Sequence, residues 1–202
     1  LDTKIKEMLS PKKSLNILKK TNALLEGHFV LSSGLHSSKY IQCAKLLSYP
    51  HLATKICKSL ANKIKKNFRK IDLILAPAVG GIIIGYEIGR ILKKETIFCE
   101  RLKGKFVLRR GFKIKKGSRV LIIEDVITTG KSSMECVKLI KKAKAQLLGF
   151  ASIIDRSTQK KLKIKKKIIS HLKIEVPTYK KNQLPKELRS LPISTPGSRF
   201  IK

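Results

Sequence analysis

The sequence predicts an α/β fold in which helices flank a parallel β-sheet. Two runs, 96–100 and 119–124, are almost continuously apolar, which is typical of strands buried on both faces. Amphipathic or small-residue stretches at 82–92 and 132–143 separate the apolar runs and are long enough to be helices. Strands that alternate with helices predict a parallel sheet covered on both sides.

The elements before this core predict a small N-terminal hood. Leucines recur at nearly helical spacing over 15–25, so we expect a helix there. After Gly27 the chain is expected to form a short strand over 29–31 and a second one near Tyr40. Apolar residues then recur every fourth position over 50–68, which predicts a longer helix leading into the core.

The remaining strands of the core are short apolar runs. The run 71–76 ends at Pro77, and a glycine-rich turn then opens the helix at 82–92. A last predicted strand covers 147–154, and the lysine-rich patch 160–167 is compatible with a solvated strand or helix edge. Strand, turn and helix therefore follow one another through the middle of the chain.

Length and composition predict one domain. The chain has 202 residues and is 42% hydrophobic, enough for one substantial core. We expect a hood at about 1–48, a core at about 49–156 and a C-terminal segment at about 157–202. No apolar stretch approaches the ~20 residues of a membrane-spanning helix, and no secretory signal is recognisable, so a cytoplasmic protein is expected.

The distribution of charge and the spacing of the cysteines limit the kinds of binding partner and metal site to be expected. The net charge is +33, but lysines are spread over every segment, only 5% of residues are aromatic and there is no Trp. Nucleic acid is therefore an unlikely main partner, and attraction of anionic small molecules is the better interpretation. The four cysteines, Cys43, Cys57, Cys99 and Cys136, form no metal-ligand spacing and are expected to be reduced, buried thiols.

The most informative segment is 120–132, which reads VLIIEDVITTGKS. Glu124 and Asp125 stand where a buried strand ends, and ligands of open parallel sheets bind at the carboxyl ends of strands. The small, hydroxyl-rich loop from Thr128 to Ser132 leads into a helix. Free amides and the helix dipole favour a phosphate there.

A carboxylate pair beside a phosphate loop is suited to ribose 5-phosphate. The carboxylates would accept hydrogen bonds from the sugar hydroxyls, and the loop would hold the phosphate. The alternative is that the acidic pair only caps a helix next to an ordinary turn. A nucleoside-triphosphate loop is disfavoured, because the required glycine spacing is missing.

This segment resembles the phosphoribosyl pyrophosphate motif of the type I phosphoribosyltransferases. The resemblance extends from about residue 14 to the C-terminus, and further blocks resemble the orotate-specific members of that family. Those blocks are 27–37, 76–81, 100–101, 108–112, 154–156 and 196–199.

The resemblance implies a fold and an activity. The implied fold is the type I phosphoribosyltransferase fold, with a five-stranded parallel core, flanking helices and a small hood. The implied activity transfers ribose 5-phosphate from phosphoribosyl pyrophosphate to orotate, giving orotidine 5′-phosphate and pyrophosphate in pyrimidine synthesis. It also implies a homodimer and Mg²⁺ that is held mainly by the cosubstrate, with no metal site made by the protein alone.

The resemblance also implies roles for individual residues. Catalytic roles fall on Glu124, Asp125, Arg101 and Lys103. Orotate contacts fall on Thr128 and Arg156, the alternative for Arg156 being an ion pair at a strand end. Contacts to phosphoribosyl pyrophosphate fall on Gly80, Gly81, Arg101, Lys103, Lys105, Glu124, Asp125, Val126, Ile127, Thr128, Thr129, Gly130, Lys131 and Ser132.

The chain departs from the family pattern at three places. The segment 101–110 resembles the mobile loop that closes over pyrophosphate in this family, but it has no histidine, and none occurs between residues 100 and 112. Ser32 and Gly80 stand where the better-known branch of the family has lysines. We expect the phosphate contacts to come from the loop cations instead. His28 and His36 either touch orotate or have a structural role. Two other functions stay open: transfer to a purine or uracil, and a regulator that senses phosphoribosyl pyrophosphate and binds nucleic acid.

Overall fold

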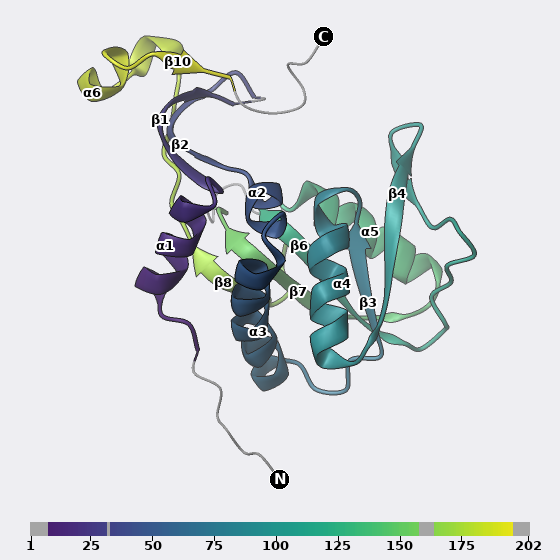
Figure 1. The fold of residues 1–202 in the computed structure, drawn as a ribbon. Coiled ribbons are helices and arrows are strands. Elements are labelled where there is room, and N and C mark those ends of the chain that lie inside the picture. The colour runs from purple at the N-terminus through teal and green to yellow at the C-terminus, as the bar shows by residue number, and fades with distance from the viewer. Residues whose placement is uncertain (1–7, 32, 158–163, 196–202) are drawn as a thin grey trace.

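Two β-sheets organise the protein. The computed structural model describes residues 8–31, 33–157 and 164–195. The larger sheet has six strands in the order β5-β4-β3-β6-β7-β8, and the smaller one has four in the order β10-β1-β2-β9. Figure 1 shows the smaller sheet as a hood beside one edge of the larger sheet. Ser32, the first half of the lysine-rich patch (160–163) and the block 196–199 lie outside the described residues.

The larger sheet confirms the predicted α/β fold class. Neighbouring strands from β4 to β8 are parallel, and only β5 runs antiparallel, against β4. The expected five-stranded parallel core is therefore present in the described part of the chain, with β8 as a strand that the sequence analysis did not predict. The strands are β3 (Leu73–Pro77), β4 (Glu95–Leu102), β5 (Lys105–Val107), β6 (Arg119–Ile127), β7 (Gln146–Asp155) and β8 (Ile168–Lys173).

Helices cover both faces of this sheet. Along β6, Leu121 and Ile123 belong to the core cluster that includes α3 and α4, whereas Val120 and Ile122 belong to the cluster that includes α5. Figure 1 accordingly shows α3 and α4 on the opposite side of the sheet from α5. The helices are α1 (Pro11–Lys20), α2 (Cys43–Leu47), α3 (Pro50–Asn67), α4 (Gly80–Leu92), α5 (Lys131–Lys142) and α6 (Lys186–Arg189), with a 3₁₀ turn at Lys181–Gln183.

The hood is built from both ends of the chain. Its central hairpin is β1 (Leu24–Val30) and β2 (His36–Ile41), and the short strands β9 (Thr178–Tyr179) and β10 (Ile193–Ser194) flank it. The sequence predicts this hood from the N-terminal residues alone. Strands of two residues carry too little pattern to be recognised in a sequence.

One predicted boundary was wrong. The helix expected over 15–25 ends at Lys20, and Leu24 and Leu25 belong to β1. Asn22 has a φ of 53°, which places it in the left-handed region that ends helices. The two leucines continue a helical spacing by chance, because a short apolar run fits either structure.

Close packing of α4 places its first turn at the sheet edge. A Cβ at Gly85 would lie 2.8 Å from the Cβ of Ala76, and one at Gly89 would overlap the Thr96 side chain. Only glycines let the helix backbone approach β3 and β4 so closely. The N-terminus of α4 is thereby held directly after the end of β3.

The cysteines are reduced and buried, as predicted. All four cysteines are free and buried. Within the described residues, we find no helix with the length and apolar character to cross a bilayer.

Candidate functional site

Strand β6 carries two acidic residues near its carboxyl end, Glu124 and Asp125, and continues for two residues beyond them to Ile127. Glu124 is 8% exposed, and the Ser133 hydroxyl donates a hydrogen bond to its Oε1. Burial raises the pKa of Glu124 to about 7; the bond from Ser133 opposes this rise and the charge of Asp125 adds to it. Burial also raises the pKa of Asp125, and the Val126 amide, which donates to its Oδ1 at 2.9 Å, opposes that rise.

The structure brings the predicted glycine turn against this acidic pair. A Cβ at Gly80 would lie 2.7 Å from Oδ2 of Asp125, so any larger residue would force the carboxylate to move. This contact gives a physical reason for glycine at a position where the better-known branch has lysine. Gly81 is also closely packed, because its Cβ would lie 3.0 Å from Cδ of Pro77 and 3.1 Å from the carbonyl oxygen of Ile123.

The predicted phosphate loop connects the acidic pair to α5. Thr128, Thr129 and Lys131 are exposed, Ser132 is half-buried, and Gly130 precedes the helix with a φ of 72°. The first amides of a helix have no carbonyl partner within it, so this end of α5 can accept an anion. Val126 and Ile127, by contrast, pack their side chains into the two core clusters, which leaves only their backbone for a ligand.

Arg156 is a partly buried cation beside this loop. Its amide donates to the carbonyl oxygen of Ile127 at 2.8 Å, which fixes the residue at the end of β6. Burial lowers the pKa of Arg156, and Coulombic interactions with Tyr40 of β2 and Cys43 of α2 oppose this shift. Its Nε is buried without a hydrogen-bond partner in the described part of the chain.

The alternative role of Arg156, an ion pair at a strand end, is not observed among the described residues. A buried cation that lacks a counter-charge is costly unless an anion binds to it. The surroundings of Arg156 therefore suit an anionic ligand.

The predicted mobile loop begins as a β-hairpin. Strands β4 and β5 are joined by Lys103 and Gly104, whose φ values are 47° and 77°, as in a tight two-residue turn. Lys103 and Lys105 are exposed and have no ion pair in the described part of the protein. Figure 1 shows the hairpin extending beyond the sheet edge, on the side opposite the hood.

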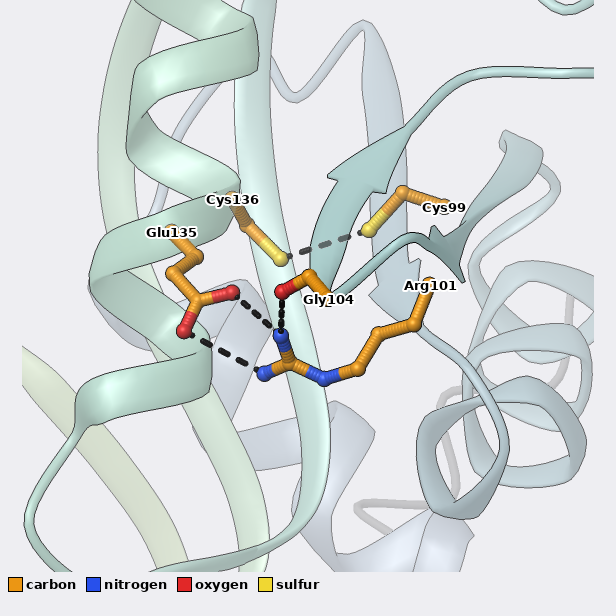
Figure 2. A network of polar contacts seen from close by, with 5 residues as sticks. All are labelled: Cys99, Arg101, Gly104, Glu135 and Cys136. Atoms are coloured by element: carbon orange, nitrogen blue, oxygen red, sulfur yellow. Dashed lines mark hydrogen bonds and ion pairs between the residues drawn. The ribbon is translucent and has the colours of Figure 1, made fainter.

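Arg101 is held by α5 and not by the acidic pair. Its guanidinium donates to both carboxylate oxygens of Glu135, at 2.7 and 3.2 Å, and to the carbonyl oxygen of Gly104 at 2.8 Å. The guanidinium also lies 4.2 Å from the centre of the Phe106 ring. Figure 2 shows this network, with the buried thiols of Cys99 and Cys136 3.4 Å apart next to it.

The second half of the loop folds back on Glu100. The Glu100 carboxylate accepts bonds from Arg109 at 3.3 Å and from Arg110 at 2.6 Å. The structure thus places the acidic pair, the phosphate loop, the glycine turn and Arg156 in one site. Among the described residues, Arg101, Lys103 and Lys105 make no hydrogen bond or ion pair to that site.

The sequence analysis missed Ser133, Glu135 and Glu100 as partners of site residues. Ser133 follows the predicted loop directly, and Glu135 is the only acidic residue of α5. These two features of the sequence could have indicated Ser133 and Glu135 as partners.

The two hood histidines contact each other. His28 Nε2 and His36 Nδ1 are 2.7 Å apart, and both residues are buried. This arrangement accords with the structural alternative for the pair.

Comparison with known proteins identifies the family. Residues 48–186 match the phosphoribosyl transferase domain family. An orotate phosphoribosyltransferase from Parvibaculum lavamentivorans is 47% identical over 96% of this chain and 100% of its own length. The chain belongs to the orotate phosphoribosyltransferase family. Another member, from Caldicellulosiruptor saccharolyticus, is 44% identical over 93% of this chain and 97% of its own.

Solved structures share the fold of this family. The orotate phosphoribosyltransferase from Aeropyrum pernix superposes with a TM-score of 0.67 at 22% identity, over 79% of this chain and 92% of that one. At this identity the likeness supports the fold and no finer property.

Within residues 8–31, 33–157 and 164–195, no group of three or more His, Cys, Asp or Glu side chains could hold a metal ion.

Proposed function

We propose that the protein transfers ribose 5-phosphate from phosphoribosyl pyrophosphate to orotate and releases pyrophosphate, in cytoplasmic pyrimidine nucleotide synthesis. One observation carries the proposal. In a chain 47% identical to an orotate phosphoribosyltransferase, a largely buried carboxylate pair, a helix N-terminus and an arginine without an ion pair among the described residues lie together near the carboxyl end of β6. The free, buried cysteines accord with a reducing compartment.

The acidic pair and the loop are suited to the two ends of the sugar. Glu124 and Asp125 would accept hydrogen bonds from the 2′ and 3′ hydroxyls, and the loop amides and hydroxyls from Thr128 to Ser132 would hold the 5-phosphate. When the bond from C1 to pyrophosphate breaks, positive character builds on the ribose. Ionised carboxylates beside the ring would stabilise that charge.

The glycine turn and the hairpin are suited to pyrophosphate. The first amides of α4, at Gly80 and Gly81, lie next to Asp125 and can donate to phosphate oxygens. Arg101, Lys103 and Lys105 would approach from the hairpin. Mg²⁺ bound by the cosubstrate would neutralise part of the charge on the leaving group.

Arg156 and Thr128 would bind orotate. Orotate carries a carboxylate, and a guanidinium can bind a carboxylate through two parallel hydrogen bonds. Arg156 has a buried donor without a partner in the described residues, and the Ile127 carbonyl that holds its amide precedes Thr128 directly. The base would thus lie beside the sugar site.

A homodimer is part of the proposal. Val79, Ile83 and Tyr86 form one face at the start of α4 and are 82%, 55% and 66% exposed. Such an apolar face beside a site commonly marks a protein contact, and a second copy would let its hairpin reach this site. We expect light scattering to give the mass of a dimer, and Ile83→Asp to shift it toward the monomer; a monomeric wild type would contradict this part.

The activity is tested with purified protein, Mg²⁺ and phosphoribosyl pyrophosphate. The ultraviolet absorbance of orotate should fall as the nucleotide forms. Adenine, hypoxanthine and uracil, offered separately, should not be consumed. Turnover of one of these bases without turnover of orotate would show that the base is wrong, and no turnover at micromolar enzyme would overturn the whole proposal.

A further inference from the structure

Ser133 contacts the acidic pair from the first turn of α5. It is the third residue of that helix and is fully buried. Its hydroxyl donates to Oε1 of Glu124, and no other side chain among the described residues hydrogen bonds to this carboxylate. The contact fixes one carboxylate oxygen and leaves Oε2 for a ligand.

The contact from Ser133 affects the ionisation of Glu124, because the surroundings of this carboxylate favour its protonated form. Burial and the neighbouring Asp125 both raise the pKa of Glu124, and Ser133 is the group that opposes them. A hydroxyl that donates to a carboxylate favours its ionised form. Without Ser133, the carboxylate would lose both its orientation and its main support as an anion.

Ser133 also follows the phosphate loop directly. The amides at the start of α5 and the Ser133 hydroxyl belong to one helical turn, whose position relative to β6 is fixed by packing of Val137 and Ile140. Any shift of this turn would therefore move both the phosphate site and the support of Glu124.

We propose that Ser133 is a positioning residue for Glu124, and that the helix turn which receives the 5-phosphate also aims the carboxylate that receives the ribose hydroxyl. The inference rests on the proposed function for the identity of the sugar ligand. It assigns no contact between Ser133 and the substrate.

The test compares pH profiles of kcat/KM for phosphoribosyl pyrophosphate. Ser133→Ala removes the donor at nearly unchanged volume, and Ser133→Cys replaces it with a weak donor on a larger atom. In both variants we expect the acidic limb to move to higher pH by about one to two units, since a hydroxyl that donates to a carboxylate favours its ionised form. Ser133→Thr, which keeps the hydroxyl, should stay closer to the wild-type profile.

A buried serine elsewhere provides the control. Ser59 of α3 is 2% exposed and accepts a bond from the Leu9 amide, so Ser59→Ala should leave the profile unchanged. If Ser133→Ala and Ser133→Cys keep the wild-type midpoint, whether or not their rates fall uniformly, Ser133 is only structural and the inference is overturned.

Binding measurements separate this inference from the proposed function. Calorimetric titration with Mg²⁺ and phosphoribosyl pyrophosphate, without any base, should show the same shift in the pH dependence of affinity. If the wild type binds the sugar with this dependence but does not consume orotate, the proposed function fails and the role of Ser133 stands. If orotate is consumed and neither midpoint moves in the variants, only the role of Ser133 fails.

Discussion

The buried part of the candidate site and its hairpin differ in how their charges are compensated. At the sheet edge, Glu124 and Asp125 have raised pKa values and Arg156 has a buried donor without a described partner. On the hairpin, Arg101 is paired with Glu135, while Arg109 and Arg110 share Glu100. Uncompensated charge is expected where a ligand completes the site, whereas paired charge stabilises a conformation that must change if those groups act.

This difference suggests that the two regions contribute to the reaction at different stages. The sheet edge is preorganised by packing and would bind sugar and base without rearrangement. For Arg101 to reach pyrophosphate, it would have to exchange the Glu135 carboxylate for phosphate oxygens, which are similar anionic acceptors. The hairpin would therefore contribute to the reaction only after a conformational step.

The largest expected effect comes from the buried carboxylates. Asp125→Asn should lower turnover by well over tenfold and leave the fold intact, because the volume is kept while the charge beside the ribose is lost. Steady-state kinetics and circular dichroism check both parts. Asp72→Asn is the matched control, since Asp72 directly precedes β3 and is paired with Arg119 at the start of β6, at the other end of the strands from Asp125. Normal turnover in Asp125→Asn would mean that the acidic pair is structural.

Loss of the partly buried cation should affect orotate selectively. Arg156→Gln is expected to raise the KM for orotate by roughly tenfold or more, as for other charged hydrogen bonds that are removed. The free energy of unfolding should stay the same or increase, because a buried cation without a counter-charge is unfavourable. Kinetics at saturating phosphoribosyl pyrophosphate and thermal unfolding test this, with Arg119→Gln as the control. A raised KM for the sugar alone would contradict the assignment.

The pH dependence should separate activity from stability. Since the pKa of Glu124 is about 7 in the folded protein, kcat/KM for phosphoribosyl pyrophosphate should fall about tenfold for each pH unit below that value if the ionised form binds the sugar. The same raised pKa means that protonation stabilises the folded state. The contribution of Glu124 to the free energy of unfolding is therefore fully present below about pH 4.5 and is lost as pH rises through 7.

Denaturant titrations at several pH values measure the stability part of this prediction. The difference between wild type and Glu124→Gln should follow the stated trend. An activity that stays flat down to pH 5.5 would show that Glu124 is not required in its ionised form.

The smallest effect is expected at the hairpin. Glu135→Gln weakens the hold on Arg101, so the KM for phosphoribosyl pyrophosphate should fall a few-fold if release of Arg101 precedes closure. Exposed ion pairs contribute only about 0.2–1 kcal/mol, which limits the change. Glu26→Gln, which disrupts the exposed pair with Lys19, serves as the control. A rise in KM would instead mean that Glu135 positions Arg101 productively.

The parts predicted from the sequence are those controlled by local pattern. The strand before Glu124, the loop to Ser132 and the helix after it combine burial, small residues and a helix start within one segment. The partnership of Arg101 with Glu135 joins residues 34 positions apart, and β9 and β10 join the hood from the far end of the chain. Such contacts depend on tertiary packing, which no local period encodes.

The most direct test of the account is a crystal structure with Mg²⁺, orotate and a non-reactive analogue of phosphoribosyl pyrophosphate. We expect the 5-phosphate on the first amides of α5, the ribose hydroxyls on Glu124 and Asp125, and the orotate carboxylate on Arg156. A sugar phosphate bound away from the end of β6, or an orotate that does not contact Arg156, would contradict it.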